Sequence, residues 1–236
     1  MRKLLFIGVI ILLIWGFSTI YKKDAAVVVV EPTVIPLCFY AETPTGRGLF
    51  DVALLKMNLV GDTVTGEFRN IPAEKDSKVG TFEGTVSAVD PIVMARTANV
   101  WWDSLAEGMH VTEELKIIFG EGNAQAGFGE MIDRGDGAYI YKDVSKIVYG
   151  KTMTDVACSD LDDRLLVEKY IRENIVTLAQ TKPVLGGTWY ITRVSLDPTP
   201  KTGMMFYEDG HIVGSATFSY TRDGDQVTIS NIKKIK

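Results

Sequence analysis

The stretch LVGDTVTGEFRNIPAEKDSKVGTFEGTV, residues 59–86, carries the clearest fold signal of the chain. Apolar and polar side chains alternate on both flanks of a charged middle, which is the period-two pattern of two β-strands joined by a loop. Gly66 and Gly84 nevertheless lie in the inner row, by which we mean the strand face that also carries the large apolar residues two positions away on either side. Because glycine weakens a flat strand, we expect both to lie where the sheet bends and a side chain would collide with a helix or the opposite wall.

The alternating pattern continues on both sides of this stretch. The segments 60–63, 121–123 and 133–138 combine Gly with Asp, Asn or Glu, as tight hairpins require. Eight antiparallel strands with internal glycines predict a curled sheet or a small up-and-down barrel, lipocalin-like in outline, over residues 37–150. The eight predicted strands are 37–42, 51–60, 63–71, 79–89, 92–102, 113–121, 123–132 and 138–144.

One amphipathic helix is predicted after this β-region, over residues 158–182. Acidic residues at positions 160, 162 and 163 favour a helix N-terminus, where the backbone N–H groups concentrate positive charge. Ser159 or Asp160 is the expected N-cap, and Pro183 is the expected stop. The apolar residues that recur at helical spacing are Leu161, Leu165, Tyr170, Ile171, Ile175 and Leu178.

Residues 185–236 predict a short four-strand antiparallel β-region with hairpin turns at 208–211 and 222–226. Within it, LGGTW is followed by F-x-x-D-G-x-x-x-G-x-A and by D-G-D-x-V-T-I. On these motifs residues 185–232 resemble the META/HslJ-like domain of bacterial envelope proteins, which implies a small β-domain in the cell envelope. That family typically has Gly-Cys-Asn where this chain has Gly214-Ser215-Ala216, so the resemblance assigns no functional residue.

Residues 1–23 are predicted to be a membrane anchor or a signal segment. Two basic residues precede an uncharged, mostly apolar run from 4 to 20, and two lysines follow it. About 17 such residues suffice for a transmembrane helix when flanking Lys and aromatic side chains reach the interface. A cleaved signal peptide stays open as the alternative, although the residues after the run make a poor cleavage site. Residues 24–36, with β-branched residues and prolines, predict an extended linker.

These features predict a mainly β, single-pass membrane protein whose C-terminal part lies outside the cytoplasm, in the periplasm or the extracellular space. The two cysteines fit this location, because an oxidising compartment favours a disulfide between Cys38 and Cys158. The alternative is two unpaired, buried cysteines. A disulfide would close a loop of about 120 residues and tie the predicted helix to the first predicted strand.

No catalytic, cofactor-binding or metal-binding constellation is predicted. His110 and His211 lack a nucleophile motif and the spacing of metal ligands. The net charge of −5 opposes nucleic-acid binding, which needs a basic face. The adjacent Trp101 and Trp102 are the candidate ligand or partner contacts, since strand geometry points one toward the core and the other toward a rim. A role as core plug is the competing interpretation.

We therefore expect a non-enzymatic binding or structural role in the cell envelope. The expected partners are the membrane, through the N-terminal helix, and a small apolar ligand, a peptide or another envelope protein. The alternative is a hydrolase or isomerase whose carboxylates, such as Glu67, Glu83 or Glu130, line a barrel interior. A hollow interior with two close carboxylates would favour the enzyme, and a filled interior the binding or structural role.

Overall fold

The glycine-bearing stretch 59–86 contains two long antiparallel strands, β3 (Thr63–Ile71) and β4 (Lys78–Val86), in the computed structural model of the protein. The structure describes residues 32–46, 49–184 and 186–235. The predicted transmembrane segment and most of the predicted linker lie outside these residues. Among the residues that are described, no helix has both the length and the apolar character needed to cross a bilayer.

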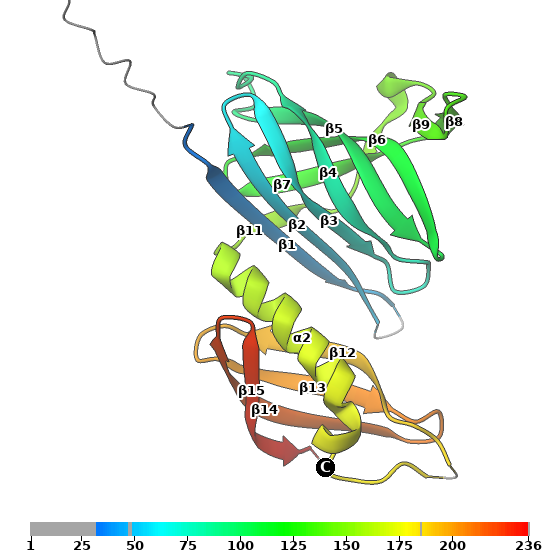
Figure 1. Ribbon diagram of the computed structural model, residues 1–236, viewed down its shortest axis with the longest axis vertical. Helices are drawn as coiled ribbons and strands as arrows, with labels where there is room; N and C mark the ends of the chain where they lie inside the picture. Colours follow the sequence, from blue (N-terminus) through cyan, green and yellow to red (C-terminus); the bar gives the residue numbers. More distant parts are fainter. Residues whose placement is uncertain (1–31, 47–48, 185, 236) are drawn as a thin grey trace, which may run out of the picture. The chain divides into compact units, whose positions relative to one another are not determined.

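Eight strands close into an antiparallel barrel (Figure 1). Each strand pairs with the next one around the wall, and β11 pairs with both β7 and β1, which completes the ring. The predicted small barrel is therefore confirmed. Besides β3 and β4, its strands are β1 (Ile35–Pro44), β2 (Phe50–Val60), β5 (Arg96–Ala106), β6 (Met109–Gly120), β7 (Asn123–Phe128) and β11 (Met153–Asp155).

The eighth barrel strand is not the predicted one, 138–144. The chain after β7 forms a hairpin of β8 (Met131–Asp133) and β9 (Ala138–Tyr141), and β9 pairs parallel with β6. The hydroxyl of Tyr141 donates to the carbonyl of Gly127 (2.9 Å) and accepts from the amide of Lys116 (3.2 Å). These bonds tie the hairpin to β6 and β7, so the ring is closed only later, by β11.

The connection from the hairpin to β11 contains two short elements, η1 (Val144–Lys146) and β10 (Val148–Tyr149). β10 pairs with the end of β7. A second difference concerns β5, which begins later than predicted because residues 91–94 form a turn. The predicted hairpin turns are confirmed, as Gly61, Gly122 and Gly135 all have positive φ.

The two inner-row glycines lie where neighbouring strands approach very closely. A Cβ added to Gly66 would lie 2.1 Å from the carbonyl oxygen of Lys56 and 2.5 Å from the ring of Phe82. At Gly84 it would lie 2.2 Å from the carbonyl oxygen of Asn99. The predicted collision is therefore confirmed, but its expected partner, a helix or the opposite wall, is wrong. The obstructing atoms belong to the adjacent strands β2, β4 and β5.

Apolar side chains fill the barrel interior. The rings of Phe68 and Trp102 lie 5.1 Å apart at its centre, in a tilted arrangement. Among the described residues, Ser104 is the one buried polar residue of the barrel strands, and its hydroxyl donates to the carbonyl of Val111 (3.3 Å). The buried residues of this core are Phe39, Leu55, Met57, Leu59, Val64, Phe68, Phe82, Val86, Ala98, Val100, Trp102, Leu115, Ile117, Phe119, Ala124, Ala126 and Met153.

The predicted amphipathic helix is α2 (Cys158–Leu178). Its first turn has no side-chain cap, so the expected cap by Ser159 or Asp160 is wrong. The helix ends ahead of Pro183 because Gln180 has a φ of 55°, which a right-handed helix cannot contain. A carboxylate of the helix, Asp163, is buried and accepts hydrogen bonds from Arg222 and from Lys201 Nζ (3.3 Å).

The C-terminal strands form the predicted antiparallel β-region of four strands, a separate sheet in the order β12–β13–β14–β15 (Figure 1). The helix packs against this sheet and shares an apolar core with it, in which Val167, Ile171, Trp189 and Tyr207 are buried. We call α2 and this sheet the C-terminal layer. The strands are β12 (Tyr190–Asp197), β13 (Thr202–Glu208), β14 (Val213–Asp223) and β15 (Gln226–Lys234).

Candidate functional site

The two tryptophans predicted as contact residues have different surroundings. Trp102 is fully buried in the barrel core, and its Nε1 donates to the carbonyl of Gly80 (3.2 Å), so its observed place is that of a core plug. Trp101 is half-buried, and the guanidinium of Arg134 lies 4.7 Å from the centre of its ring. Neither tryptophan lines the cleft described below.

The carboxylates considered for catalysis do not line the barrel interior. Glu67 is half-buried and pairs with Arg69 (2.6 Å), while Glu83 is exposed. Glu130 is exposed and pairs with Lys142 (2.7 Å). Apolar side chains fill most of the interior and leave a cavity of about 180 Å³, whose lining includes Phe68, Ala126 and Met153. None of these three glutamates lines it.

The main cleft lies outside the barrel, between strands β1–β3 and the C-terminal layer. It has a volume of about 1240 Å³. Its apolar floor includes Val52, Leu54 and Ile71 from the barrel wall and Leu165 from α2. Charged side chains of both signs line the cleft. The cationic ones are Lys56, Arg69, Arg164, Lys169, Arg172, Arg193 and Arg222, and the acidic ones are Glu42, Asp162, Glu168, Glu173 and Asp225.

The alternation of β1 and β2 places these residues in the cleft. In β1, Phe39 points into the barrel, so its neighbours Cys38 and Tyr40 point outward. In β2, Leu55 is inside the barrel, whereas Leu54 is buried on the outer side. A strand that is apolar on both faces must be covered on both, and this signal in residues 50–60 could have indicated from the sequence that the outer face of the strand is covered.

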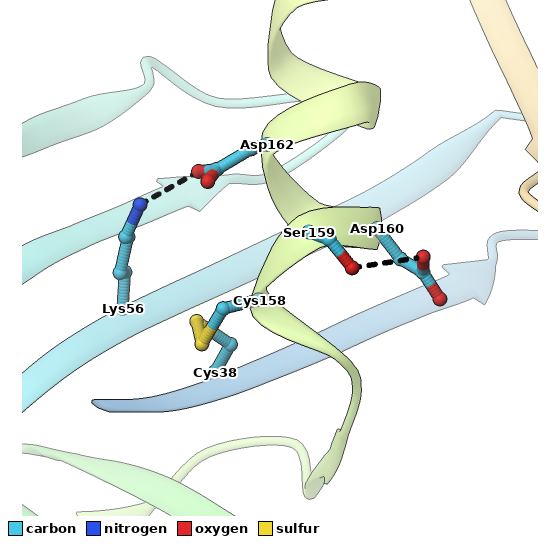
Figure 2. The surroundings of a disulfide bond; sticks show 6 residues. All are labelled: Cys38, Lys56, Cys158, Ser159, Asp160 and Asp162. Carbon is cyan, nitrogen blue, oxygen red and sulfur yellow. Dashed lines mark hydrogen bonds and ion pairs between the residues drawn. A yellow bond between two sulfur atoms is a disulfide. The ribbon is translucent and has the colours of Figure 1, made fainter. Parts of the chain in front are cut away.

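A disulfide and an ion pair join α2 to the barrel wall at one side of the cleft (Figure 2). Cys38 and Cys158 form the disulfide, with their Cα atoms 5.2 Å apart, which confirms the predicted pairing. Lys56 lies opposite Cys38 on the neighbouring strand, and its Nζ is 2.6 Å from Asp162 Oδ1. Both links bind the N-terminal end of α2, and they fix this wall of the cleft.

A second link to the barrel comes from β12. Arg193 Nε lies 2.8 Å from Glu42 Oε1 on β1, and its guanidinium lies 3.5 Å from the ring centre of Phe50 on β2. The side chain of Glu42 is only 17 % exposed. A charge-assisted hydrogen bond combined with stacking on an aromatic face holds the guanidinium in one orientation.

Arg164 is the cation of the cleft that is oriented without a carboxylate. Its guanidinium lies 4.0 Å from the ring centre of Tyr40, and its NH2 group lies 3.4 Å from the carbonyl oxygen of Leu196. Within the described part of the chain, no carboxylate lies within ion-pair distance of Arg164. Burial raises the pKa of Tyr40 above its ordinary value of 10.0, Arg164 opposes this, and Glu42 adds to it. Tyr40 thus remains a neutral hydrogen-bond donor, and its hydroxyl donates to Glu42 Oε2 (2.9 Å).

The cleft combines three kinds of group. Apolar groups, aromatic rings and fixed guanidinium groups together suit a ligand that carries both apolar parts and negative charge. Over the described ranges, no group of three or more His, Cys, Asp or Glu side chains is arranged to hold a metal ion. Of the two histidines, His110 is exposed, with Nδ1 3.7 Å from Asp103 Oδ1. His211 contributes its backbone amide to Asp209.

The aspartate of the F-x-x-D-G motif has a structural role. Asp209 accepts hydrogen bonds from the backbone amides of Val184 (2.7 Å), His211 (2.9 Å) and Ile212 (2.8 Å). Burial of this carboxyl acts to raise its pKa, but the three amides stabilise the anion and leave the pKa below its ordinary value of 3.8. The motif therefore fixes the loop between β13 and β14 against the segment that enters the sheet.

Comparison of the chain with known protein families, with curated proteins and with solved structures finds no match. The resemblance of residues 185–232 to the META/HslJ-like domain accordingly stays a prediction. The cleft is then characterised by its own geometry alone.

Proposed function

We propose that this protein is a non-enzymatic, membrane-tethered envelope protein whose cleft binds an extended, acidic and apolar segment of another envelope protein. The observation that carries the proposal is the cleft itself, which has a volume of about 1240 Å³ and an apolar floor. Beside this floor lies the fixed guanidinium of Arg164, which has no carboxylate partner among the described residues. Sites for small molecules usually occupy about 300–1,000 Å³, so this cleft suits a longer ligand.

The charges favour a peptide that carries carboxylates. Arg172 and Arg193 already have their own glutamates, whereas the donors of Arg164 are held in place by Tyr40 without such a partner. A guanidinium held in this way can bind a carboxylate through two parallel hydrogen bonds without first losing much side-chain freedom. Apolar residues of an extended peptide, at every second position, would contact the floor formed by Val52, Leu54 and Ile71.

The tether and the location are supported by two features of the chain. The apolar run from 4 to 20 is flanked by basic residues, as in single-pass anchors. The disulfide between Cys38 and Cys158 is of the kind that persists in oxidising compartments. Together they favour a single-pass protein whose described part lies outside the cytoplasm.

Fluorescence anisotropy with two short peptides tests the binding proposal, using full-length protein in detergent micelles. One peptide alternates Val and Glu, and the other alternates Val and Lys. We expect the Glu peptide to bind and the Lys peptide to bind much more weakly. Arg164→Glu should weaken binding of the Glu peptide by at least about tenfold, because it places like charges together.

The matched control is Arg134→Glu, which also removes a guanidinium that stacks on an aromatic ring, but outside the cleft. It should leave the affinity unchanged. Equal affinity for the two peptides, or an Arg164→Glu variant that binds like the wild type, would contradict the proposal.

The tether is tested separately by washing membranes with alkaline carbonate. We expect the full chain to stay in the membrane fraction. A soluble product that begins near residue 26 would replace the anchor by a cleaved signal peptide and leave the binding proposal untouched.

A further inference from the structure

The loop between β4 and β5, residues 87–95, exposes a group of apolar side chains. Ile92 is 89 % exposed, Val93 61 %, Met94 53 % and Val89 53 %. Single exposed apolar residues are common on proteins, but four within six positions form a patch, and such patches mark interaction sites. The neighbouring part of the loop is neutral except for Asp90.

This patch is presented by an ordered backbone. The amide of Asp90 donates to the carbonyl of Ala95 (2.8 Å), and Asp90 Oδ1 accepts from the amide of Ile92 (2.8 Å). At the base, Arg96 Nε donates to the carbonyl of Ser87 (2.8 Å). A loop whose polar groups are bonded internally can enter an apolar phase at lower cost, because fewer backbone groups would lose water there.

The patch lies at the barrel end where the described chain begins. Ile35 pairs with the end of β2, Val86 with the start of β5, and Arg96 with the end of β6, so the β4–β5 loop and the start of β1 share one end of the barrel (Figure 1). Val34 and Ile35 are exposed there too. If residues 4–20 span a bilayer, the segment from 21 to 33 limits the distance between this end of the barrel and the bilayer to at most roughly 45 Å, its fully extended length.

The charged residues at this end of the barrel do not favour binding to anionic lipid surfaces. Asp62, Glu121 and Asp155 lie in the turns and strand end around the loop, with Arg96 as the basic residue beside Asp62. A contact made here would therefore be apolar and insensitive to salt, unlike the binding of polybasic segments to acidic lipids.

We infer that Ile92 and Val93 insert into the interfacial region of a lipid bilayer and form a second membrane contact beside the N-terminal anchor. This inference rests on the proposed tether. It also has a consequence for the proposed cleft, whose lining includes Pro72, Ala73 and Ser77 from the opposite end of the barrel. A barrel held by the loop would direct that part of the cleft away from the lipid surface.

The test uses the full chain reconstituted into phosphatidylcholine vesicles, with the disulfide intact. Ile92→Cys carries the environment-sensitive dye NBD, and the matched control Lys75→Cys carries the same dye in the β3–β4 loop at the opposite barrel end. We expect nitroxide-labelled lipids to quench the dye at position 92 and not at position 75. Aqueous iodide should do the reverse, and high salt should change neither result.

Three outcomes would overturn the inference. A vesicle-bound protein whose dye at position 92 is quenched by iodide as at position 75 rules out the loop contact and leaves the tether standing. Lipid quenching that disappears at high salt makes the contact electrostatic and equally excludes apolar insertion. A protein that does not float with the vesicles overturns the tether and, with it, the loop contact.

Discussion

The barrel and the C-terminal layer are of similar β-rich construction, yet their cores differ in kind. The barrel interior is apolar, with Ser104 as its buried polar residue among those described. The C-terminal layer buries two carboxylates, Asp163 between α2 and the sheet and Asp209 in the β13–β14 loop. The barrel is thus stabilised by the packing of apolar side chains, and the C-terminal layer also by hydrogen bonds and ion pairs of buried carboxylates.

This difference shows two ways to specify one structure. In the barrel, small residues stand where strands approach closely, and large rings fill the remaining space, so shape alone selects the register. In the layer, a helix on a sheet can slide, and we infer that Asp163 fixes its position through Arg222 and Lys201. A buried ion pair contributes little net stability but strongly penalises misplacement.

The largest effect is expected from Trp102→Ala. It removes a fully buried ring from a core that cannot collapse around the gap, and should lower the free energy of unfolding by about 3 to 5 kcal/mol. The matched control Trp101→Ala, on the half-buried outer side, should cost less than about 1 kcal/mol. Urea unfolding followed by far-UV circular dichroism measures both. Similar losses of unfolding free energy for the two variants would contradict the conclusion that the packing of the interior determines the stability of the barrel.

Removal of the disulfide tests whether the two regions unfold together. The double variant Cys38→Ala/Cys158→Ala frees a loop with a sequence separation of 120 and should lose about 2 to 4 kcal/mol. Because the bond joins β1 to α2, we expect one transition in the wild type and two in the variant. The measurement is calorimetric and spectroscopic unfolding of the same samples. A single transition in the variant would show that the cleft contacts alone couple the regions.

Gly84→Val tests the close approach of the strands in the barrel wall. A side chain would meet the backbone of Asn99 and Val100, which cannot move aside, so we expect a loss of about 1 to 3 kcal/mol. This loss opposes the better strand propensity of valine, which is worth up to about 1 kcal/mol. The control Thr81→Val adds a β-branched apolar residue on the exposed face of the same strand. A Gly84→Val variant more stable than the wild type would mean that the wall is open at this point.

The smallest effect is expected from Asp209→Asn, and it should depend on pH. The folded state lowers the pKa of Asp209 below 3.8, so its stabilising contribution is fully present above about pH 4 and is lost as the pH falls through the lower, folded-state value. The asparagine variant lacks this titration. Its unfolding free energy should therefore fall less steeply than that of the wild type between about pH 5 and pH 2. Parallel pH profiles of the wild type and the variant would show that the charge of Asp209 does not stabilise this loop.

Much of the fold follows from local patterns in the sequence. Alternation located β2 and β3 closely, and the glycine-containing turns were predicted because positive φ is a local requirement. The pairing of Cys38 with Cys158 followed from number and location. These signals need no knowledge of distant contacts.

The closing strand and the cleft depend on contacts between distant residues, and local patterns could not reveal them. Residues 138–141 and 153–155 are both short strands, and long-range contacts such as the bonds of Tyr141 and the pairing of β9 with β6 hold the first of them outside the ring. The cleft combines Tyr40 with Arg164, which are far apart in the sequence. The outer apolar residues of β2 indicated that something covers that face, but not what covers it.

The position of the disulfide also determines how the molecule would respond to tension. A pull between Val34 and the C-terminal layer passes from the first residues of β1 to Cys38, across the sulfur–sulfur bond and directly into α2. The barrel strands between the two cysteines lie outside that load path. A protein drawn by a bound partner against its attachment point would transmit the force while its barrel stays relaxed. Reduction of this single bond would route the load through the barrel strands and through the ion pairs that Lys56 and Arg193 make between the barrel and the layer.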